Sequence, residues 1–371
     1  MHALRERLRR GRAQEAPAGG AAIELQGIRK RYEGAQVLES VDLTVQRGEF
    51  VCLLGPSGCG KTTTLNVIAG FVEPDSGTML LDGRRMDGTP PHRRHLGMVF
   101  QRYTLFPHMT MFDNVAFGLR IRRVPRAEIQ ERVEESLALV GLSGLGRRYA
   151  SELSGGQQQR AALARALVVK PSVLLYDEPL SSLDALLRRE MQVELRRIHE
   201  EQGLTSIYVT HDQEEALVMS DRIVVLHDGR IEQDAPPEAV YRRPRTRFVA
   251  EFLGDCNILT AVVVQSERGA IRAEIAPGWT VTVGGVDVPP APGSLVTLGI
   301  REEHVGIEPV AAEASVGTVR NVIYRGSSWR YYVGLHTGEI RATHVAGAAA
   351  IAAGEAVALT TRPEHWFVLE S

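Results

Sequence analysis

Hydrophobic positions along the first part of the chain follow two alternating patterns. Short apolar and β-branched runs, typical of strands, cover residues 23–28, 37–45 and 50–54. Windows in which apolar residues recur three and four positions apart, as on one face of a helix, cover residues 63–70, 126–140, 155–168 and 186–202. This alternation predicts a mainly parallel sheet with helices on both faces, beside an antiparallel region formed by the first two strands.

The pattern changes after Pro236 and Pro237. From Asn257 onward, short apolar runs are separated by Gly, Pro and Asp. The runs cover residues 258–265, 279–283, 295–300, 316–324, 329–335 and 355–361. Short strands at even spacing predict a small all-β barrel of the oligonucleotide/oligosaccharide-binding (OB) type. We expect the boundary between the two domains near Gly254.

The length of the chain supports this division. Single hydrophobic cores stop growing near about 250–300 residues, so a chain of 371 residues is expected to hold more than one domain. The expected parts are an Arg-rich tail over 1–21, an α/β domain over 22–254 with a helical subdomain over 102–160, and an all-β domain over 255–371. The tail is predicted to be disordered, with a lipid-touching arm as the alternative. No apolar segment follows Arg9 and Arg10, which argues against an export signal.

Composition narrows the possible partners. The formal charge of −2 favours neither nucleic acid nor an anionic membrane surface, so no nucleic acid is expected as a partner. The three cysteines, Cys52, Cys59 and Cys256, form no C-x-x-C pair, which fits a reducing compartment. No apolar run approaches the roughly 20 residues that a membrane-spanning helix needs. If the protein acts at a membrane, other chains are expected to cross it.

A glycine-rich segment lies between the strand predicted over 50–54 and a helical window. It matches G-x-x-x-x-G-K-[ST], the P-loop pattern, and comprises Gly55, Pro56, Ser57, Gly58, Cys59, Gly60, Lys61 and Thr62, followed by Thr63. The glycines leave backbone N–H groups free to surround phosphate oxygens, and the positive end of the next helix adds to the attraction. Lys61 is expected to reach the β- and γ-phosphates, and the Thr62 hydroxyl to ligate Mg²⁺. The segment therefore predicts a nucleotide site.

Cys59 occupies a variable position of this segment at the N-terminus of the predicted helix. The pKa of a thiol tends to fall at such a position, which would allow a redox switch. The favoured interpretation is a small residue that the loop tolerates, and both interpretations stay open at this stage.

A second apolar run, over residues 172–176, ends in Asp177 and Glu178. Ligand sites in parallel sheets lie at the carboxyl ends of the strands, so these carboxylates are expected at the phosphate end of the site. Asp177 would hold Mg²⁺ through water, and Glu178 would orient or deprotonate the attacking water. An Asp-Glu pair alone is a weak signal, because salt-bridged strand ends are common.

Leu153-Ser154-Gly155-Gly156-Gln157 stands before a helical window, between the P-loop and the Asp-Glu strand. This pentapeptide, in this order along the chain, resembles the signature of ABC ATPases. The resemblance covers at least residues 22–254. It implies an α/β P-loop NTPase fold with a mainly parallel sheet, an antiparallel β subdomain and a helical subdomain, together with the cofactors ATP and Mg²⁺.

The resemblance extends to further motifs. Tyr32 looks like the aromatic residue that stacks on adenine, and Gln101 looks like the Q-loop residue that senses Mg²⁺ and the attacking water. Ser182-Leu183-Asp184 resembles the D-loop, although Ser182 stands where the family often has Ala. His211 looks like the switch histidine that touches the γ-phosphate.

The family pattern also implies how a complete site forms. The P-loop of one subunit faces the signature of another, where Ser154 and the N-terminus of the helix that begins with Gly155 and Gly156 approach the γ-phosphate. One chain holds one P-loop and one signature. A homodimer with two sandwiched ATP molecules is therefore expected, in which Gln157 and Asp184 come from the opposite chain.

Three classes of ABC protein compete: importer subunits, exporter halves and non-transport ATPases. The 99–115 stretch resembles the segment through which importer ATPases bind the short cytoplasmic helices of their permeases. Its apolar side chains form an adaptable surface for a partner helix, although about half of them are expected to be core. They are Tyr103, Phe106, Met109, Met111 and Phe112.

The all-β tail resembles the regulatory (TOBE) domain of importer ATPases for maltose, ferric iron and spermidine/putrescine. Residues 317–326 and 329–333 look most like the polyamine members, with ferric iron or a sugar as the alternative cargo. The resemblance implies two permease subunits as partners and, indirectly, a periplasmic binding protein. It also implies a peripheral position at the cytoplasmic face of the inner membrane.

Overall fold

The computed structural model of the protein describes residues 21–101, 104–310, 316–335, 338–347 and 350–370. The chain folds into two compact units that divide between Pro237 and Glu238. The predicted Arg-rich tail lies outside the described residues except for Ala21, which begins the first strand.

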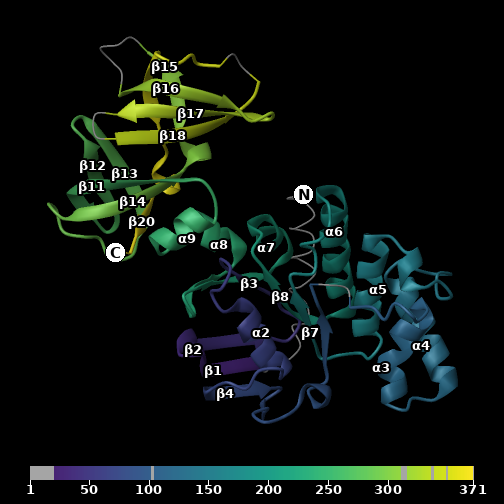
Figure 1. The fold of residues 1–371 in the computed structure, drawn as a ribbon. Helices are drawn as coiled ribbons and strands as arrows, with labels where there is room; N and C mark the ends of the chain where they lie inside the picture. The colour runs from purple at the N-terminus through teal and green to yellow at the C-terminus, as the bar shows by residue number, and fades with distance from the viewer. Residues whose placement is uncertain (1–20, 102–103, 311–315, 336–337, 348–349, 371) are drawn as a thin grey trace. The chain divides into compact units, whose positions relative to one another are not determined.

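A six-stranded sheet forms the centre of the N-terminal unit, in the order β10-β9-β3-β8-β7-β6 (Figure 1). Its strands are β3 (Phe50–Leu54), β6 (Leu96–Val99), β7 (Val173–Asp177), β8 (Thr205–Thr210), β9 (Arg222–His227) and β10 (Arg230–Ala235). β3 pairs in parallel with β8 and β9, and β7 pairs in parallel with β8 and β6. Because β10 alone pairs antiparallel among these strands, the expected mainly parallel sheet is confirmed.

Helices cover both faces of this sheet. All five residues of β3 are buried, which explains its unbroken apolar run. Val51 points into a core shared with α2 (Lys61–Ala69). The preceding residue, Phe50, points to the opposite face, where its ring centroid lies 5.0 Å from that of His199 on α6 (Ala185–Gln202).

A second, antiparallel sheet packs on the other side of α2. Its order is β2-β1-β4-β5, with β1 (Ala21–Tyr32), β2 (Ala35–Gln46), β4 (Ser76–Leu81) and β5 (Arg84–Arg85). The apolar side chains of β1 and β2 join the core cluster that also holds α2 and the six-stranded sheet. One core thus fixes the position of α2 between two sheets.

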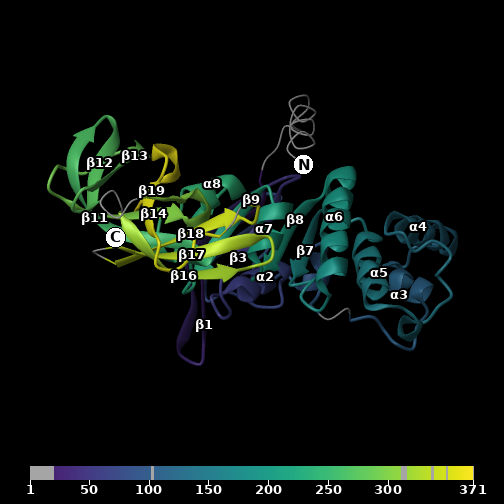
Figure 2. The ribbon, with the colours of Figure 1, turned by 90° about the horizontal axis from the view of Figure 1, so that it is seen from above.

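Three helices form the helical subdomain: α3 (Met111–Ile121), α4 (Arg126–Leu139) and α5 (Gly155–Leu167). α3 packs against both α4 and α5, and Figures 1 and 2 show the group apart from β1, β2 and β4. The sequence predicted α4 and α5 but treated the start of α3 only as a partner-binding stretch. Thr110 begins α3 by accepting a hydrogen bond from the Asp113 backbone N–H at 3.1 Å. No helix within the described residues combines the length and apolar character needed to cross a membrane.

The C-terminal unit is built from two five-stranded antiparallel sheets, ordered β13-β12-β11-β14-β20 and β15-β19-β16-β17-β18. The strands are β11 (Cys256–Glu267), β12 (Gly269–Ala276), β13 (Trp279–Val286), β14 (Leu295–Arg301), β15 (Gly306–Pro309), β16 (Gly317–Tyr324), β17 (Ser328–Leu335), β18 (Gly338–Val345), β19 (Ala356–Thr360) and β20 (Phe367–Leu369). The all-β prediction is confirmed. The sequence did not predict four of these strands. β15 and β20 are short, and the inward residues of β12 and β18, Ala273 and Ala342, give only a weak hydrophobic signal.

The C-terminal unit begins earlier than the expected boundary near Gly254. Two short helices, α8 (Pro237–Arg242) and α9 (Arg247–Phe252), pack onto it through the buried side chain of Arg301. The Arg301 guanidinium donates hydrogen bonds to the carbonyls of Ala250 at 2.7 Å, Gly254 at 3.0 Å and Tyr241 at 3.0 Å. These bonds satisfy carbonyls at the ends of both helices and attach them to β14.

We expect Arg301→Met to destabilise the C-terminal unit by about 2–4 kcal/mol, because several buried carbonyls would lose their donor. The three tryptophans, Trp279, Trp329 and Trp366, all lie in this unit, so their fluorescence during urea unfolding measures its stability. The exposed Arg268 offers a matched control as Arg268→Met. Equal stability of the two variants would contradict this role of Arg301.

Candidate active site

The P-loop connects the carboxyl end of β3 to the start of α2, as the sequence predicted. Gly58 and Gly60 adopt φ values of +84° and +106°, a region that favours glycine, and Gly60 is the N-cap of α2. A Cβ atom on Gly55 would lie 2.3 Å from the Leu226 carbonyl oxygen. A Cβ on Gly60 would lie 2.5 Å from Leu38 Cδ2. The loop can therefore pack this closely against Leu226 and Leu38 only because Gly55 and Gly60 carry no side chain.

Lys61, the first residue of α2, turns back over the loop. Its Nζ donates to the carbonyls of Gly55 and Pro56, both at 2.8 Å, and the side chain is buried. The ammonium group carries a positive charge and three N–H donors, and the third donor makes only a long contact to Cys59 Sγ at 3.9 Å, so it can turn to a phosphate oxygen. That charge suits the phosphate role expected of Lys61.

The pKa of the Cys59 thiol is shifted in the direction opposite to the one expected. Its side chain is buried, and burial raises the pKa of the thiol despite the nearby Lys61 ammonium, whose Nζ lies 3.9 Å from Sγ. The expectation of a lowered pKa at the helix N-terminus is therefore wrong, because desolvation of the thiolate outweighs the positive charges. A thiol held neutral and buried is a poor redox switch.

Thr62 and Asp177 form the pair that could hold a metal ion. The Thr62 hydroxyl donates to Asp177 Oδ1 at 3.2 Å, joining the start of α2 to the end of β7. A hydroxyl and a carboxylate are oxygen ligands of the kind that Mg²⁺ prefers, so these residues fit the ion. Burial, and secondarily the Glu178 charge, raise the pKa of Asp177, which favours a nearby cation when this carboxylate is ionised.

Glu178 and His211 face each other across neighbouring strands. His211 Nδ1 lies 3.2 Å from Glu178 Oε2, and the Glu178 backbone N–H donates to the Val209 carbonyl at 3.0 Å. Glu178 has φ +43°, which is strained for a residue with a side chain. The backbone turns sharply at the end of β7, and the carboxylate meets the imidazole that follows β8.

Gln101 is connected to Glu178 through the hydroxyl group of Ser181. Its Nε2 donates to the Ser181 hydroxyl at 3.4 Å, and that hydroxyl donates to the Glu178 carbonyl at 2.9 Å. The predicted residues Lys61, Thr62, Asp177, Glu178, His211 and Gln101 are therefore gathered at one edge of the sheet.

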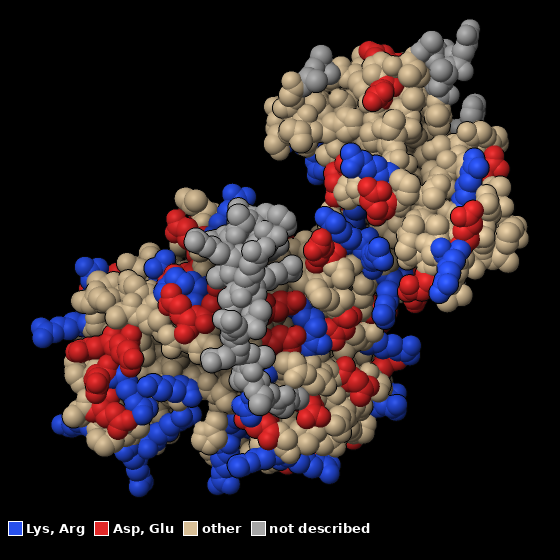
Figure 3. All heavy atoms as spheres, turned by 180° about the vertical axis from the view of Figure 1, so that it is seen from behind, with Lys and Arg blue, Asp and Glu red and all other residues tan. Residues whose placement is uncertain are grey.

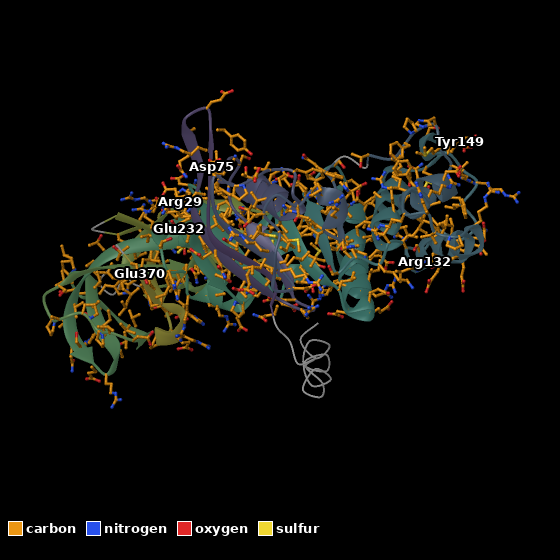
Figure 4. The ribbon with its side chains drawn as sticks, turned by 90° about the horizontal axis from the view of Figure 1, so that it is seen from below. Arg29, Asp75, Arg132, Tyr149, Glu232 and Glu370 are labelled. Carbon is orange, nitrogen blue, oxygen red and sulfur yellow. The ribbon has the colours of Figure 1, made fainter. Side chains whose placement is uncertain are left out.

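Tyr32 ends β1 and is 43 % exposed, so one face of its ring is available for stacking. Lys30 Nζ lies 5.5 Å from the centre of the ring and donates to Asp75 Oδ1 at 2.8 Å. The Asp75 backbone N–H in turn donates to the Arg29 carbonyl, and Figure 4 shows the two labelled residues close together. These bonds hold the strand end that carries Tyr32.

The signature residues lie in the helical subdomain. Ser154 is the N-cap of α5: its hydroxyl oxygen accepts from the Gln157 backbone N–H at 3.4 Å, while Gln157 Oε1 accepts from the Ser154 N–H at 3.1 Å. Because the hydroxyl acts as an acceptor here, its hydrogen is free to donate to an anion. A Cβ on Gly156 would lie 2.8 Å from Leu187 Cδ2, so glycine allows α5 to approach α6.

Asp184 has a local role that the sequence reading did not include. It is the N-cap of α6 and accepts from the backbone N–H groups of Leu186 at 3.1 Å and Leu187 at 3.0 Å. The contacts of Asp184 and Ser154 are thus with their own helices. Within one chain, the structure brings together the P-loop, Asp177, Glu178 and His211, but not the signature.

The stretch expected to bind a permease helix is partly core. Met111 is fully buried, Phe106, Met109 and Phe112 are half-buried, and Tyr103 lies outside the described residues. The sequence reading missed Phe71, which is 56 % exposed and lies with its ring centroid 6.2 Å from that of Phe100. The sequence could have indicated this residue, because an exposed aromatic side chain is unusual two positions after the last residue of α2.

Comparison with known proteins agrees with this geometry. Residues 38–181 match the model of the ABC transporter family, and residues 298–369 match the TOBE domain. The spermidine/putrescine import ATP-binding protein of Rubrobacter xylanophilus is 47 % identical over 361 residues, covering 94 % of this chain and 93 % of that protein. The protein of the same name from Thermobifida fusca is 46 % identical over 374 residues, covering 96 % of each.

Solved structures extend the agreement to the fold. The cbiO1 subunit of an ABC transporter complex from Clostridium perfringens superposes with a TM-score of 0.56 at 30 % identity, covering 59 % of this chain and 90 % of its own. An ATP-binding cassette solved as a dimer in a post-hydrolysis state with ADP and Pi gives 0.53 at 32 % identity, covering 58 % and 98 %. The P-loop fold and the family expected from the motifs are confirmed. The chain belongs to the ABC transporter family, as an ATP-hydrolysing subunit with a C-terminal TOBE domain.

Proposed function

We propose that this chain energises an importer of polyamines, the class that includes spermidine and putrescine. The observation that carries the proposal is the 47 % identity, over 94 % of the chain, to a protein named for spermidine/putrescine import. Both units lie within that similarity, so it includes the C-terminal unit that the cassette superpositions leave out.

The nucleotide site is proposed to close between two copies of the chain. In one copy the P-loop, Asp177, Glu178 and His211 are joined by short contacts, whereas Ser154 and Asp184 contact their own helices. The Ser154 hydroxyl and the N-terminus of α5 offer donors suited to a γ-phosphate. A second copy that brings its signature to this P-loop would complete the site. The similar cassette that was solved with ADP and Pi is a dimer, which supports this proposal.

ATP would bind with its phosphates against the P-loop amides and Lys61 and its adenine against Tyr32. Mg²⁺ would be held by Thr62, Asp177 and Gln101 and, when bound, neutralises phosphate charge. Asp177 binds a cation only when ionised, and its raised pKa means that nucleotide binding weakens as the pH falls, earlier than for an ordinary Asp.

Glu178 and His211 are proposed to perform the hydrolytic step. The Glu178 carboxylate accepts a hydrogen bond from the attacking water and takes its proton as the oxygen bonds to the γ-phosphorus. The bond between that phosphorus and the bridging oxygen breaks, leaving ADP and inorganic phosphate. His211 orients the carboxylate through its 3.2 Å contact. When both ring nitrogens carry a proton, Nδ1 donates to Glu178 and Nε2 is a donor for the γ-phosphate.

Glu178→Gln keeps the shape of the side chain but removes its basicity. We expect ATP binding to remain near wild type, kcat to fall by at least about 100-fold, and ATP to hold the protein as a dimer in size-exclusion chromatography. Glu214→Gln, an exposed residue on α7 (Gln213–Met219), is the matched control. Wild-type turnover in Glu178→Gln would exclude this role.

Arg188 on α6 connects the D-loop to the loop that carries His211. Its Nη2 donates to the Leu183 carbonyl at 3.0 Å, and its Nη1 lies 3.6 Å from Asp212 Oδ2. The Asp212 backbone N–H donates to Thr210 Oγ1 at 3.0 Å, so the residues on both sides of His211 are fixed. Because the D-loop is expected to face the partner chain, Arg188 is proposed to transmit dimer closure to His211.

We expect Arg188→Ala to lower kcat about tenfold while changing the KM for ATP much less, since Arg188 positions a loop without touching nucleotide. Steady-state ATPase assays at several ATP concentrations measure both constants. Arg189→Ala, at the exposed neighbouring position, is the control. An equal loss in both variants, or a loss matched by a lower melting temperature, would contradict the proposed link.

The permease is proposed to dock beside Gln101, on the half-buried residues of the 101–115 stretch and on the exposed Phe71 with its half-buried neighbour Phe100. Apolar, adaptable side chains of this kind suit an incoming helix. A dock next to Gln101 would link closure of the nucleotide site to two permease subunits. The chain would then sit at the cytoplasmic face of the inner membrane, held there by the permease.

Reconstitution tests the cargo. The protein is combined in lipid nanodiscs with its neighbouring permease subunits and binding protein, and ATPase rates are measured with spermidine-loaded, ferric-iron-loaded and empty binding protein. We expect a severalfold stimulation by spermidine-loaded binding protein only. Stimulation by iron and not by spermidine would overturn the polyamine proposal while leaving the importer assignment in place.

A further inference from the structure

A buried carboxylate lies next to the loop that carries His211. Glu215 of α7 is 3 % exposed, and α7 packs against β3 and β8. Tyr208 and Thr210 of β8 are buried as well. Because these two residues are two positions apart on a strand, their side chains point to the same face of the sheet. Both hydroxyl groups donate to one oxygen, Glu215 Oε2, from Tyr208 at 2.8 Å and from Thr210 at 2.7 Å.

The contact between Thr210 and Glu215 is part of a closed ring of hydrogen bonds. The Thr210 hydroxyl group has one hydrogen, and because Glu215 accepts it, the hydroxyl oxygen is left to accept from another donor. It accepts from the Asp212 backbone N–H at 3.0 Å. Asp212 Oδ1 in turn accepts from the Glu215 backbone N–H at 3.2 Å. The ring begins and ends at Glu215, and His211 lies inside the segment that it closes.

The direction of the His211 side chain depends on this segment. The side chain is 56 % exposed, and its Nδ1 lies 3.2 Å from Glu178 Oε2. Thr210 immediately precedes His211 and Asp212 immediately follows it, so the ring fixes the backbone on both sides. A change of dihedral angle at either neighbour would move the imidazole away from Glu178. Small displacements of this kind are costly for a group that must meet a reacting phosphate.

Charged and titratable groups reach Glu215 from each element that packs against it. Nε of Arg188 on α6 lies 3.9 Å from Glu215 Oε1, and Cys52 of β3 and Asp212 interact with Glu215 electrostatically. Burial raises the pKa of Glu215, whereas the hydrogen bonds from the two hydroxyl groups and the charge of Arg188 lower it. The hydroxyl groups thus stabilise the ionised carboxylate, and the carboxylate fixes their direction.

An apolar residue at position 215 would fill this part of the core with less loss of hydration. A buried carboxylate needs hydrogen-bond partners that compensate for the water it loses. One partner, Thr210, is the residue before the histidine that is proposed to contact the γ-phosphate. The other, Tyr208, is three residues from that histidine and takes no part in the ring. The two hydroxyl groups therefore share an acceptor but differ in their connection to His211.

We propose that Thr210 is a positioning residue for ATP hydrolysis, and that the buried Glu215 carboxylate holds its hydroxyl group in the direction that orients His211. The inference rests on the role of His211 proposed above. It adds two residues that do not touch the nucleotide, which the P-loop and Tyr32 are proposed to bind. Loss of this positioning is therefore expected to lower kcat and to leave the KM for ATP nearly unchanged.

Two substitutions that each remove one hydroxyl group test the proposal. Thr210→Val keeps the β-branched shape, and Tyr208→Phe keeps the aromatic ring. Each removes one hydrogen bond to the same carboxylate oxygen, so both are expected to lower the melting temperature. We expect Thr210→Val to lower kcat about tenfold with KM within about twofold of wild type, and Tyr208→Phe to keep both constants within about twofold. Steady-state ATPase assays measure the constants, and far-ultraviolet circular dichroism follows melting.

Three further variants separate positioning from a general loss of structure. Thr210→Ser keeps the hydroxyl group and is expected to have a kcat within about threefold of wild type. Glu215→Met removes the acceptor and is expected to lower kcat at least as much as Thr210→Val; if it does not fold, the Thr210 variants still decide. In a His211→Ala background, Thr210→Val is expected to change kcat by less than about twofold, because the residue it positions is already absent. Single-turnover measurements with labelled ATP quantify the slow variants.

The outcomes distinguish this inference from the function on which it rests. Wild-type kcat in Thr210→Val, an equal loss in Tyr208→Phe, or no recovery in Thr210→Ser would each overturn the positioning role. A further loss of about tenfold from Thr210→Val in the His211→Ala background would overturn it too, since the effect would then not pass through His211. Wild-type kcat in His211→Ala itself would instead contradict the proposed role of His211 in hydrolysis, and the inference would fail with it.

Discussion

The parallel register of β7, β8 and β3 is the constraint on which the site depends. Leu54 of β3 is paired with Thr210 of β8, and Val209 is paired with Asp177 of β7. Three segments far apart in the sequence therefore end at the same height, and each delivers a different group: the P-loop, the carboxylates and His211. Because side chains alternate along a strand, a shift by one residue would turn Asp177 toward the opposite face of the sheet. The buried apolar residues that fix this register are thus as necessary to catalysis as the polar ones.

Sequence patterns predicted those parts whose chemistry restricts the residue type. Only glycine fits at Gly55 and Gly60, and only an apolar run suits a strand covered on both faces, so the P-loop and β3 could be read directly. Contacts between segments that are distant in the sequence could not be predicted in this way. The link from Arg188 to Asp212 depends on how α6 lies beside the His211 loop, and an arginine in a helix gives no sign of it. The sign of the Cys59 pKa shift likewise depended on burial, which outweighs helix position.

The sequence predicted that the C-terminal unit is all-β, but it did not predict the number of strands or the two helices that precede β11. Ten strands are present where six were expected. β12 and β18 were missed because small inward residues such as Ala273 and Ala342 carry little hydrophobic signal, and β15 and β20 were missed because they have only 4 and 3 residues. The two helices that precede β11 left no sign for a related reason. α8 and α9 are held by hydrogen bonds from Arg301 to backbone carbonyls, and such bonds leave no trace in a hydrophobic pattern. Figure 3 shows Lys and Arg interspersed with Asp and Glu over the visible side of the N-terminal unit. This agrees with the small formal charge of the whole chain, −2.

The backbone at Glu178 has a consequence for how this chain can change over time. Glycine adopts a φ of +43° at a lower conformational energy than glutamate does. Replacing Glu178 by glycine would therefore relieve backbone strain, but it would also remove the carboxylate. At this position, a substitution that raises the stability of the fold would lower the rate of ATP hydrolysis. Without selection for hydrolysis, substitutions here would favour a more stable but inactive protein. Glutamate at this position therefore serves hydrolysis at a cost in backbone strain.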